Sequence, residues 1–184
     1  QGRDRSKGST AGSAGETREE PDVDEPDPDH EPDHDPDHEH VIEGLTEVLG
    51  ELARRNPNTQ IIIDHLGLAQ PFLPPAPPEP FGDLANVVEL AAYDNVAIKI
   101  SGAGTLSHQP FPYPDIWEPL GKIFDAFGFG RCLWGTDWTR AVELLNYEQG
   151  VEAFRVTDSL SDSERFELMG GTLTKIYKWS PQVG

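Results

Sequence analysis

The chain has 184 residues, enough for one domain of ordinary size, and carries 33 Asp and Glu against 14 Lys and Arg, a formal net charge of −19. This acidic balance disfavours nucleic acid and anionic membranes as partners, because both bind clustered basic side chains. The single cysteine, Cys132, excludes an intrachain disulfide and a cysteine-based zinc site. No apolar run approaches the roughly 18 residues of a membrane span, and no secretory leader is evident, so we expect a cytoplasmic protein.

Residues 1–40 differ in composition from the rest of the chain. Val23 is their only large apolar residue, and a Pro-Asp-His triplet recurs every four residues at 28–30, 32–34 and 36–38. Such a segment buries too little apolar surface to offset the entropy of ordering it, and the repeated prolines oppose a helix. We therefore predict a disordered acidic tail over residues 1–40 and a folded domain over residues 41–184.

The folded part shows alternating helical and strand patterns. In chain order we predict a helix over 41–55, a strand over 61–63, a helix capped by Asp83, a strand over 95–101, a helix over 116–127, a strand over 131–134 and further helices, the last over 172–178. Strand–helix alternation implies βαβ units and a parallel sheet, and hence the α/β class. Three strands amount to about three-eighths of an eight-stranded (β/α) barrel, although the pattern alone also allows part of an open sheet.

Polar residues follow or end each predicted strand. Asp64 and His65 end the first, Lys99 and Ser101 end the second, and Asp137 follows the third. In parallel α/β folds the carboxyl ends of the strands carry the active site, so these side chains form a candidate site. Each has another interpretation: Asp137 as a helix cap, His65 as a structural hydrogen-bonding group, and Lys99 as the partner of a carboxylate.

Three motifs and the C-terminal run resemble a known family. Ile61-Ile62-Ile63-Asp64-His65-Leu66-Gly67, Asn95-Val96-Ala97-Ile98-Lys99-Ile100-Ser101-Gly102 and Arg131-Cys132-Leu133-Trp134-Gly135-Thr136-Asp137-Trp138 are similar to the last three strands of the amidohydrolase-related family, and Gly170–Trp179 resembles its terminal helix. That family consists of metal-dependent (β/α)₈ barrels and includes lactonases, other C–O or C–N hydrolases and nonoxidative decarboxylases. The resemblance covers residues 41–180 and implies that the chain is the C-terminal part of such a barrel.

The resemblance also implies roles for individual residues. Asp137 would be a metal ligand at the end of the eighth barrel strand and would take the proton from metal-bound water. His65 would lie beside the metal at the end of the sixth strand, while Lys99 and Ser101 would face a substrate carboxylate. The implied activity is hydrolysis of a small lactone, amide or carboxylated ring by a divalent metal, with zinc as the first choice.

Other functions stay open from the sequence. The family's first strand normally supplies a His-x-His or Glu-x-His pair, and this chain has no counterpart of strands one to four, so a noncatalytic barrel fragment is one alternative. A decarboxylase using the same metal and carboxylate is another. A third is metal buffering by the Pro-Asp-His tract, whose histidines and carboxylates suit Zn²⁺, Ni²⁺ or Cu²⁺. The expected partner is a small-molecule substrate, and assembly into a homo-oligomer is left open.

Overall fold

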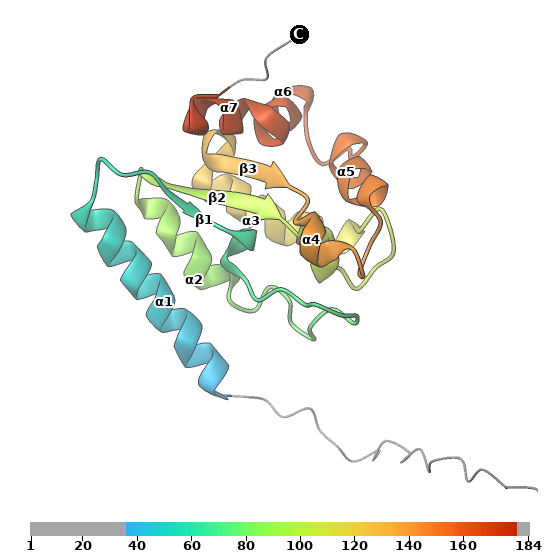
Figure 1. Cartoon of the computed structure of the whole chain (residues 1–184), viewed down its shortest axis with the longest axis horizontal. Coiled ribbons are helices and arrows are strands. Elements are labelled where there is room, and N and C mark those ends of the chain that lie inside the picture. Colours follow the sequence, from blue (N-terminus) through green and yellow to red (C-terminus); the bar gives the residue numbers. More distant parts are fainter. Residues whose placement is uncertain (1–35, 180–184) are drawn as a thin grey trace, which may run out of the picture. The chain divides into compact units, whose positions relative to one another are not determined.

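Three parallel strands form the centre of the structure (Figure 1). The computed structural model describes the backbone of residues 36–179 and the side chains of residues 46–179. The strands β1 (Ile61–Ile63), β2 (Val96–Ser101) and β3 (Cys132–Gly135) lie in the order β1-β2-β3. Ile63 pairs with Ile98, and Ile98 pairs in turn with Cys132. The three predicted strands and their parallel arrangement are confirmed.

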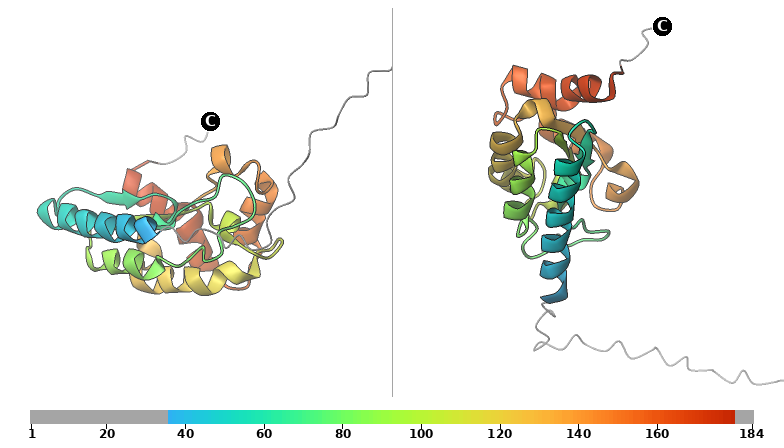
Figure 2. Two further views of the ribbon diagram at one scale, coloured as in Figure 1. Left: turned by 90° about the horizontal axis from the view of Figure 1, so that it is seen from below. Right: turned by 90° about the vertical axis from the view of Figure 1, so that its left-hand side faces the viewer.

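Helices cover the sheet on the side away from the viewer of Figure 1. The helices α2 (Leu84–Glu89) and α3 (Trp117–Phe127) contact each other there, and α1 (Pro36–Arg55) contacts α2 (Figure 2). On the other flank, the π-helical turn η6 (Glu167–Gly171) and α7 (Thr172–Tyr177) pack against β3. The strand–helix alternation predicted from the sequence is therefore the arrangement that the chain adopts.

The first helix begins earlier than the sequence pattern predicted. It starts at Pro36 and includes residues 36–40, which the composition of the sequence predicts to belong to the tail. Proline is tolerated in the first turn of a helix, where its missing N–H has no intrahelical partner to lose. The rest of the predicted tail, residues 1–35, lies outside the described residues, and the division into tail and folded domain stays a prediction.

The core lies between the sheet and the covering helices. Val96, Ile98 and Ile100 alternate along β2 and are each at most 1% exposed. On α3, four buried residues recur at helical spacing: Leu120, Ile123, Phe124 and Phe127. Burying each such side chain stabilises the fold by roughly 1.5–3 kcal/mol, so this apolar face holds α3 against the sheet.

Arg131 closes the amino end of β3. Its Nη1 donates to the carbonyl oxygens of Ala91, Tyr93 and Val96 at 3.0, 2.9 and 3.3 Å, and its Nε donates to the carbonyl of Phe127 at 2.9 Å. These acceptors are backbone groups at the ends of neighbouring elements. The guanidinium thus satisfies several carbonyls at once and ties β2 and α3 to the start of β3.

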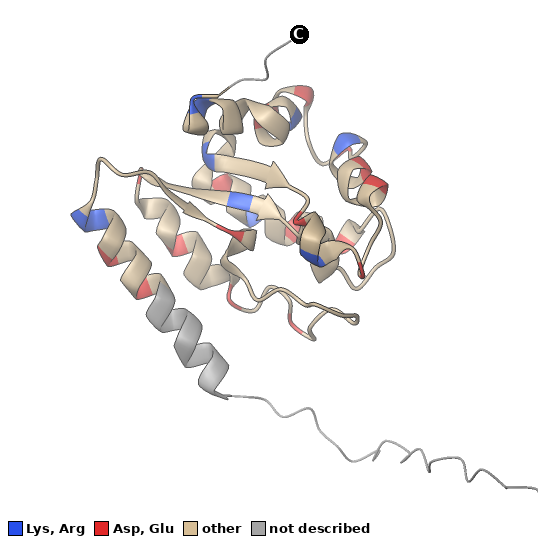
Figure 3. Cartoon of the chain, viewed as in Figure 1, with Lys and Arg blue, Asp and Glu red and all other residues tan. Residues whose placement is uncertain are grey.

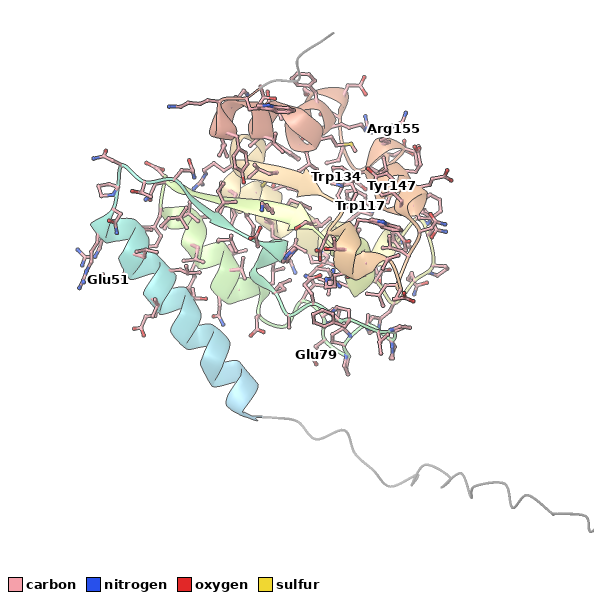
Figure 4. All side chains as sticks on the ribbon, viewed as in Figure 1. Glu51, Glu79, Trp117, Trp134, Tyr147 and Arg155 are labelled. Carbon is pink, nitrogen blue, oxygen red and sulfur yellow. The ribbon has the colours of Figure 1, made fainter. Side chains whose placement is uncertain are left out.

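The C-terminal third adds short helices beyond β3. They are α4 (Trp138–Ala141), α5 (Tyr147–Arg155) and α6 (Asp162–Phe166), followed by η6 and α7. Figure 4 labels Trp117 and Trp134 close to α5, where the ring of Phe154 lies 5.3 and 6.1 Å from theirs. This aromatic cluster anchors α5 to β3 and α3. The predicted last helix is confirmed, ending at Tyr177 instead of Lys178.

Candidate active site

The turn after β1 presents His65 through an unusual backbone. His65, Leu66 and Gly67 all have left-handed φ angles, of 51°, 63° and 67°. A left-handed conformation costs roughly 1–2 kcal/mol for each non-glycine residue. Leu66 offsets part of this cost because its side chain is completely buried. Strain of this kind collects at functional sites, where the surrounding structure holds it in place.

Asp137 is the second candidate residue with a left-handed backbone, at φ 52°. It occupies the N-cap position of α4, yet its side chain accepts no capping hydrogen bond from the backbone N–H groups of that helix. The carboxylate is 9% exposed and turns towards the strand ends instead. The Asp137 side chain therefore does not cap the helix, contrary to the alternative interpretation.

His65, Ser101 and Asp137 come together at the carboxyl end of the sheet. The Nδ1 atom of His65 lies 3.0 Å from Ser101 Oγ and 3.4 Å from Asp137 Oδ2. The three residues follow or end three different strands, so only the parallel sheet places them side by side. The convergence expected for His65, Ser101 and Asp137 is present, while their chemical roles stay predictions.

Lys99 is directed to a different partner. Its Nζ lies 2.5 Å from Asp64 Oδ1, and Figure 3 shows the acidic end of β1 beside the basic position on β2. The hydrogen bond that Lys99 donates to the Asp64 carboxylate raises the pKa of Lys99, and the negative charge of Asp64 adds to this, while desolvation partly opposes it. The alternative that Lys99 pairs with a carboxylate therefore describes its contact in this structure, and its predicted role in substrate binding is untested.

Sequence reasoning missed the polar network behind Asp137. Arg140, on α4, is 9% exposed at its side chain and donates from Nε to Asp137 Oδ2 at 2.5 Å. Its Nη2 donates to Gln70 Oε1 at 2.9 Å and to Thr105 Oγ1 at 3.1 Å, and its Nη1 donates to the Pro71 carbonyl. An Arg three residues after an Asp at a helix start is a weak signal of such a pair. Nothing in the sequence pointed to Gln70 or Thr105.

A cavity of about 800 Å³ opens beside this network. Its polar wall includes His65, Gln70, Asp137 and Arg140, and its other walls are mainly apolar. The loop after β1 contributes Phe72, whose side chain is 75% exposed. A mostly apolar cavity with a few convergent polar groups is the usual form of a small-molecule site.

The donor chemistry of His65 and Asp137 suits a divalent cation. An imidazole nitrogen and a carboxylate oxygen 3.4 Å apart are both ligands that zinc accepts. Among the described residues, however, no group of three or more His, Cys, Asp or Glu side chains is placed to hold a metal ion. Catalytic zinc sites commonly use three protein ligands, so His65 and Asp137 would form part of a larger ligand set. The predicted metal-buffering tract lies outside the described side chains.

Comparison with known proteins identifies the family. The sequence profile of the amidohydrolase family matches residues 37–179, more than half of the chain, and the chain belongs to this family. A crystal structure of an amidohydrolase from Burkholderia multivorans with bound zinc has a TM-score of 0.62 and 26% identity, covering 75% of this chain and 50% of that one. The prediction of a partial (β/α) barrel, matching the C-terminal part of the family, is confirmed.

Two relatives with named activities match shorter stretches. L-fucono-1,5-lactonase of Burkholderia ambifaria is 38% identical over 89 residues, 47% of this chain and 28% of the relative. 4-Sulfomuconolactone hydrolase of Rhizobium radiobacter is 34% identical over 97 residues, 53% of this chain and 29% of the relative. The matched stretch is thus under a third of either relative, and this chain covers half of the solved structure.

None of the described helices combines the length and the apolar composition that crossing a membrane would require.

Proposed function

We propose that this chain supplies the proton-accepting side of the active site of a metal-dependent enzyme that hydrolyses small lactones. The observation that carries the proposal is the meeting of His65 Nδ1 and Asp137 Oδ2, 3.4 Å apart, at the carboxyl end of the sheet. Membership of the amidohydrolase family supports it. So do the names of the two relatives, each of which describes the opening of a lactone ring.

Asp137 and His65 are the residues that would hold the cation. When bound, a divalent metal would polarise the lactone carbonyl and lower the pKa of water beside it. The bound zinc of the Burkholderia multivorans relative makes zinc the first metal to test. Further ligands would be needed beside these two, because catalytic zinc sites commonly use three protein ligands.

Asp137 acts as the general base in this proposal. The oxygen of the attacking water bonds to the lactone carbonyl carbon while its proton passes to the Asp137 carboxylate. The ring C–O bond then breaks, and the proton moves from Asp137 to the departing alkoxide oxygen. The product is the open-chain hydroxy acid, so the reaction needs no other co-reactant.

Ser101 and Lys99, the other two predicted residues, would support the hydrolysis step without taking part in its bond changes. Ser101 Oγ, 3.0 Å from His65 Nδ1, orients the imidazole at the edge of the cavity. The predicted contact of Ser101 with substrate would therefore involve a hydroxyl group that already pairs with His65. Lys99 could receive a substrate carboxylate only by sharing its ammonium group with Asp64.

The test is turnover of L-fucono-1,5-lactone and of 4-sulfomuconolactone by the full chain loaded with Zn²⁺ or Mn²⁺, followed by acid release. We expect Asp137→Asn to lower kcat/KM at least about 100-fold, as the loss of a general base does. Asp162→Asn is the matched control, because Asp162 also pairs with an Arg three residues later but is fully exposed. Absence of turnover with every metal, or equal rates in the two variants, would contradict the proposal.

A further inference from the structure

Arg140 uses its guanidinium donors within the protein, whereas an arginine that binds substrate keeps some of them free for the ligand. Each of its three guanidinium nitrogens donates to a protein acceptor: Nε to Asp137, Nη1 to the Pro71 carbonyl, and Nη2 to Gln70 and Thr105. The side chain is 9% exposed although it borders the cavity. The guanidinium therefore faces the protein rather than a ligand.

The contacts of Arg140 join three segments that are far apart in the sequence. Gln70 and Pro71 belong to the loop after β1, and Thr105 to the loop after β2. Gln70 in turn donates to the carbonyl of His65 at 3.0 Å, so the network reaches the backbone of the second candidate residue. One planar cation thus fixes the relative positions of both residues that define the site.

The contact to Asp137 is specific to one oxygen. Both Arg140 Nε and His65 Nδ1 approach Oδ2, and among the described residues Oδ1 has no recorded partner. With Oδ2 held, the plane of the carboxylate is set and Oδ1 is left to act. A planar fork with several donors can do this, whereas the point charge of lysine can satisfy only part of the set.

We propose that Arg140 is the positioning residue of this site, orienting the Asp137 carboxylate and locking it to the loops after β1 and β2. The effect of Arg140 on catalysis rests on the proposed function, whereas the contacts of Arg140 do not depend on it. Gly102 supports the assignment, because a Cβ at that position would meet the Arg140 guanidinium, and would lie 2.7 Å from Gln70 Oε1. The close approach of backbone and guanidinium leaves the arginine side chain with little freedom.

The first experiment follows the imidazole of His65 in the full, metal-free chain by ¹⁵N NMR at one fixed pH, with the signals assigned through His65→Gln. Arg140→Lys and Arg140→Gln should both shift the His65 ring resonances, because the carboxylate beside Nδ1 moves. Arg131→Lys is the matched control, since Arg131 also bonds several acceptors but at the opposite end of β3. Unchanged His65 signals in both Arg140 variants, or an equal shift in Arg131→Lys, would overturn the proposal.

A second readout uses Co²⁺ as a spectroscopic probe of the same chain. Loss of a group that orients a metal ligand typically weakens metal affinity by about 10- to 100-fold, and we expect that change in Arg140→Gln but not in Arg131→Lys. The rim site is identified as the part of Co²⁺ binding that Asp137→Asn removes. If Asp137→Asn removes none, the metal site of the proposed function fails, while the His65 spectrum still decides the role of Arg140. Equal Co²⁺ affinity at the rim in wild type and Arg140→Gln would overturn the positioning role.

Discussion

Arg131 and Arg140 stand at opposite ends of β3 and use the same chemistry for different purposes. Arg131 donates to backbone carbonyls at the amino end of the strand. Arg140 donates mainly to side chains at the carboxyl end, with Asp137 as its charged partner. Carbonyl acceptors come with the fold whatever the side chains are, whereas side-chain acceptors exist only in a particular sequence. We therefore assign Arg131 to the stability of the fold and Arg140 to the organisation of the candidate site.

The largest expected effect tests the structural side of this comparison. Arg131→Met should lower the free energy of unfolding by about 3 kcal/mol, because it leaves several part-buried carbonyls without a donor. Arg140→Met should cost less in stability, since its acceptors lie beside an open cavity that water can enter. Urea unfolding of both variants measures the difference. A larger loss in Arg140→Met would reverse the assignment of the two arginines.

Two glycines next to the two arginines sharpen the comparison. Gly102 and Gly128 have φ angles of 75° and 69°, but a Cβ would meet Arg140 and Gln70 at Gly102 and nothing within 4 Å at Gly128. Gly128→Ala should cost of order 1–3 kcal/mol, because its φ of 69° and ψ of 151° are essentially restricted to glycine, and should leave any turnover intact. Gly102→Ala carries a left-handed strain of roughly 1–2 kcal/mol and in addition displaces Arg140 and Gln70, so of the two variants it alone should lower turnover. Unchanged turnover in Gly102→Ala would show that Arg140 has room to move.

The buried thiol of Cys132, at the amino end of β3, makes the free energy of unfolding depend on pH. Burial raises the pKa of its thiol to about 12, partly opposed by the charge of Arg131. In the unfolded chain the thiol ionises near its ordinary pKa of about 8.5, so the stability it contributes is complete below that pH and is lost as the pH rises towards 12. At pH 10 this loss should amount to about 1–2 kcal/mol relative to pH 7. Urea unfolding at both pH values should show a loss that is larger in wild type than in Cys132→Ala by this amount.

The smallest effect is expected at Lys99. The side chains of Lys99 and Asp64 are 35% and 58% exposed, and ion pairs so open to solvent are worth about 0–1 kcal/mol. Lys99→Met should therefore change the unfolding free energy by less than about 1 kcal/mol. If Lys99 contacts a substrate carboxylate, the same variant raises KM and leaves kcat unchanged. An unchanged KM would limit Lys99 to its pair with Asp64.

The strands and the meeting of the candidate residues could be predicted because they follow from short-range rules. Apolar runs such as Ile61–Ile63 indicate buried strands, and parallel pairing then brings the residues after them to one edge. The network of Arg140, Gln70 and Thr105 could not be predicted, since its members meet only through the paths of two long loops. The start of α1 at Pro36 was also missed, because a proline repeat hides the fact that its last member can begin a helix.

The left-handed turn at residues 65–67 bears on how this protein could be re-engineered. A side chain branched at Cβ is poorly tolerated at such φ angles, so His65 and Leu66 accept few replacements even where space allows. The neighbouring Phe72 is 75% exposed, lines the cavity and carries no such restriction. A mutant library aimed at new substrates would therefore keep residues 65–67 constant and diversify position 72, where an altered side chain changes the wall of the cavity without disturbing the turn that holds the histidine.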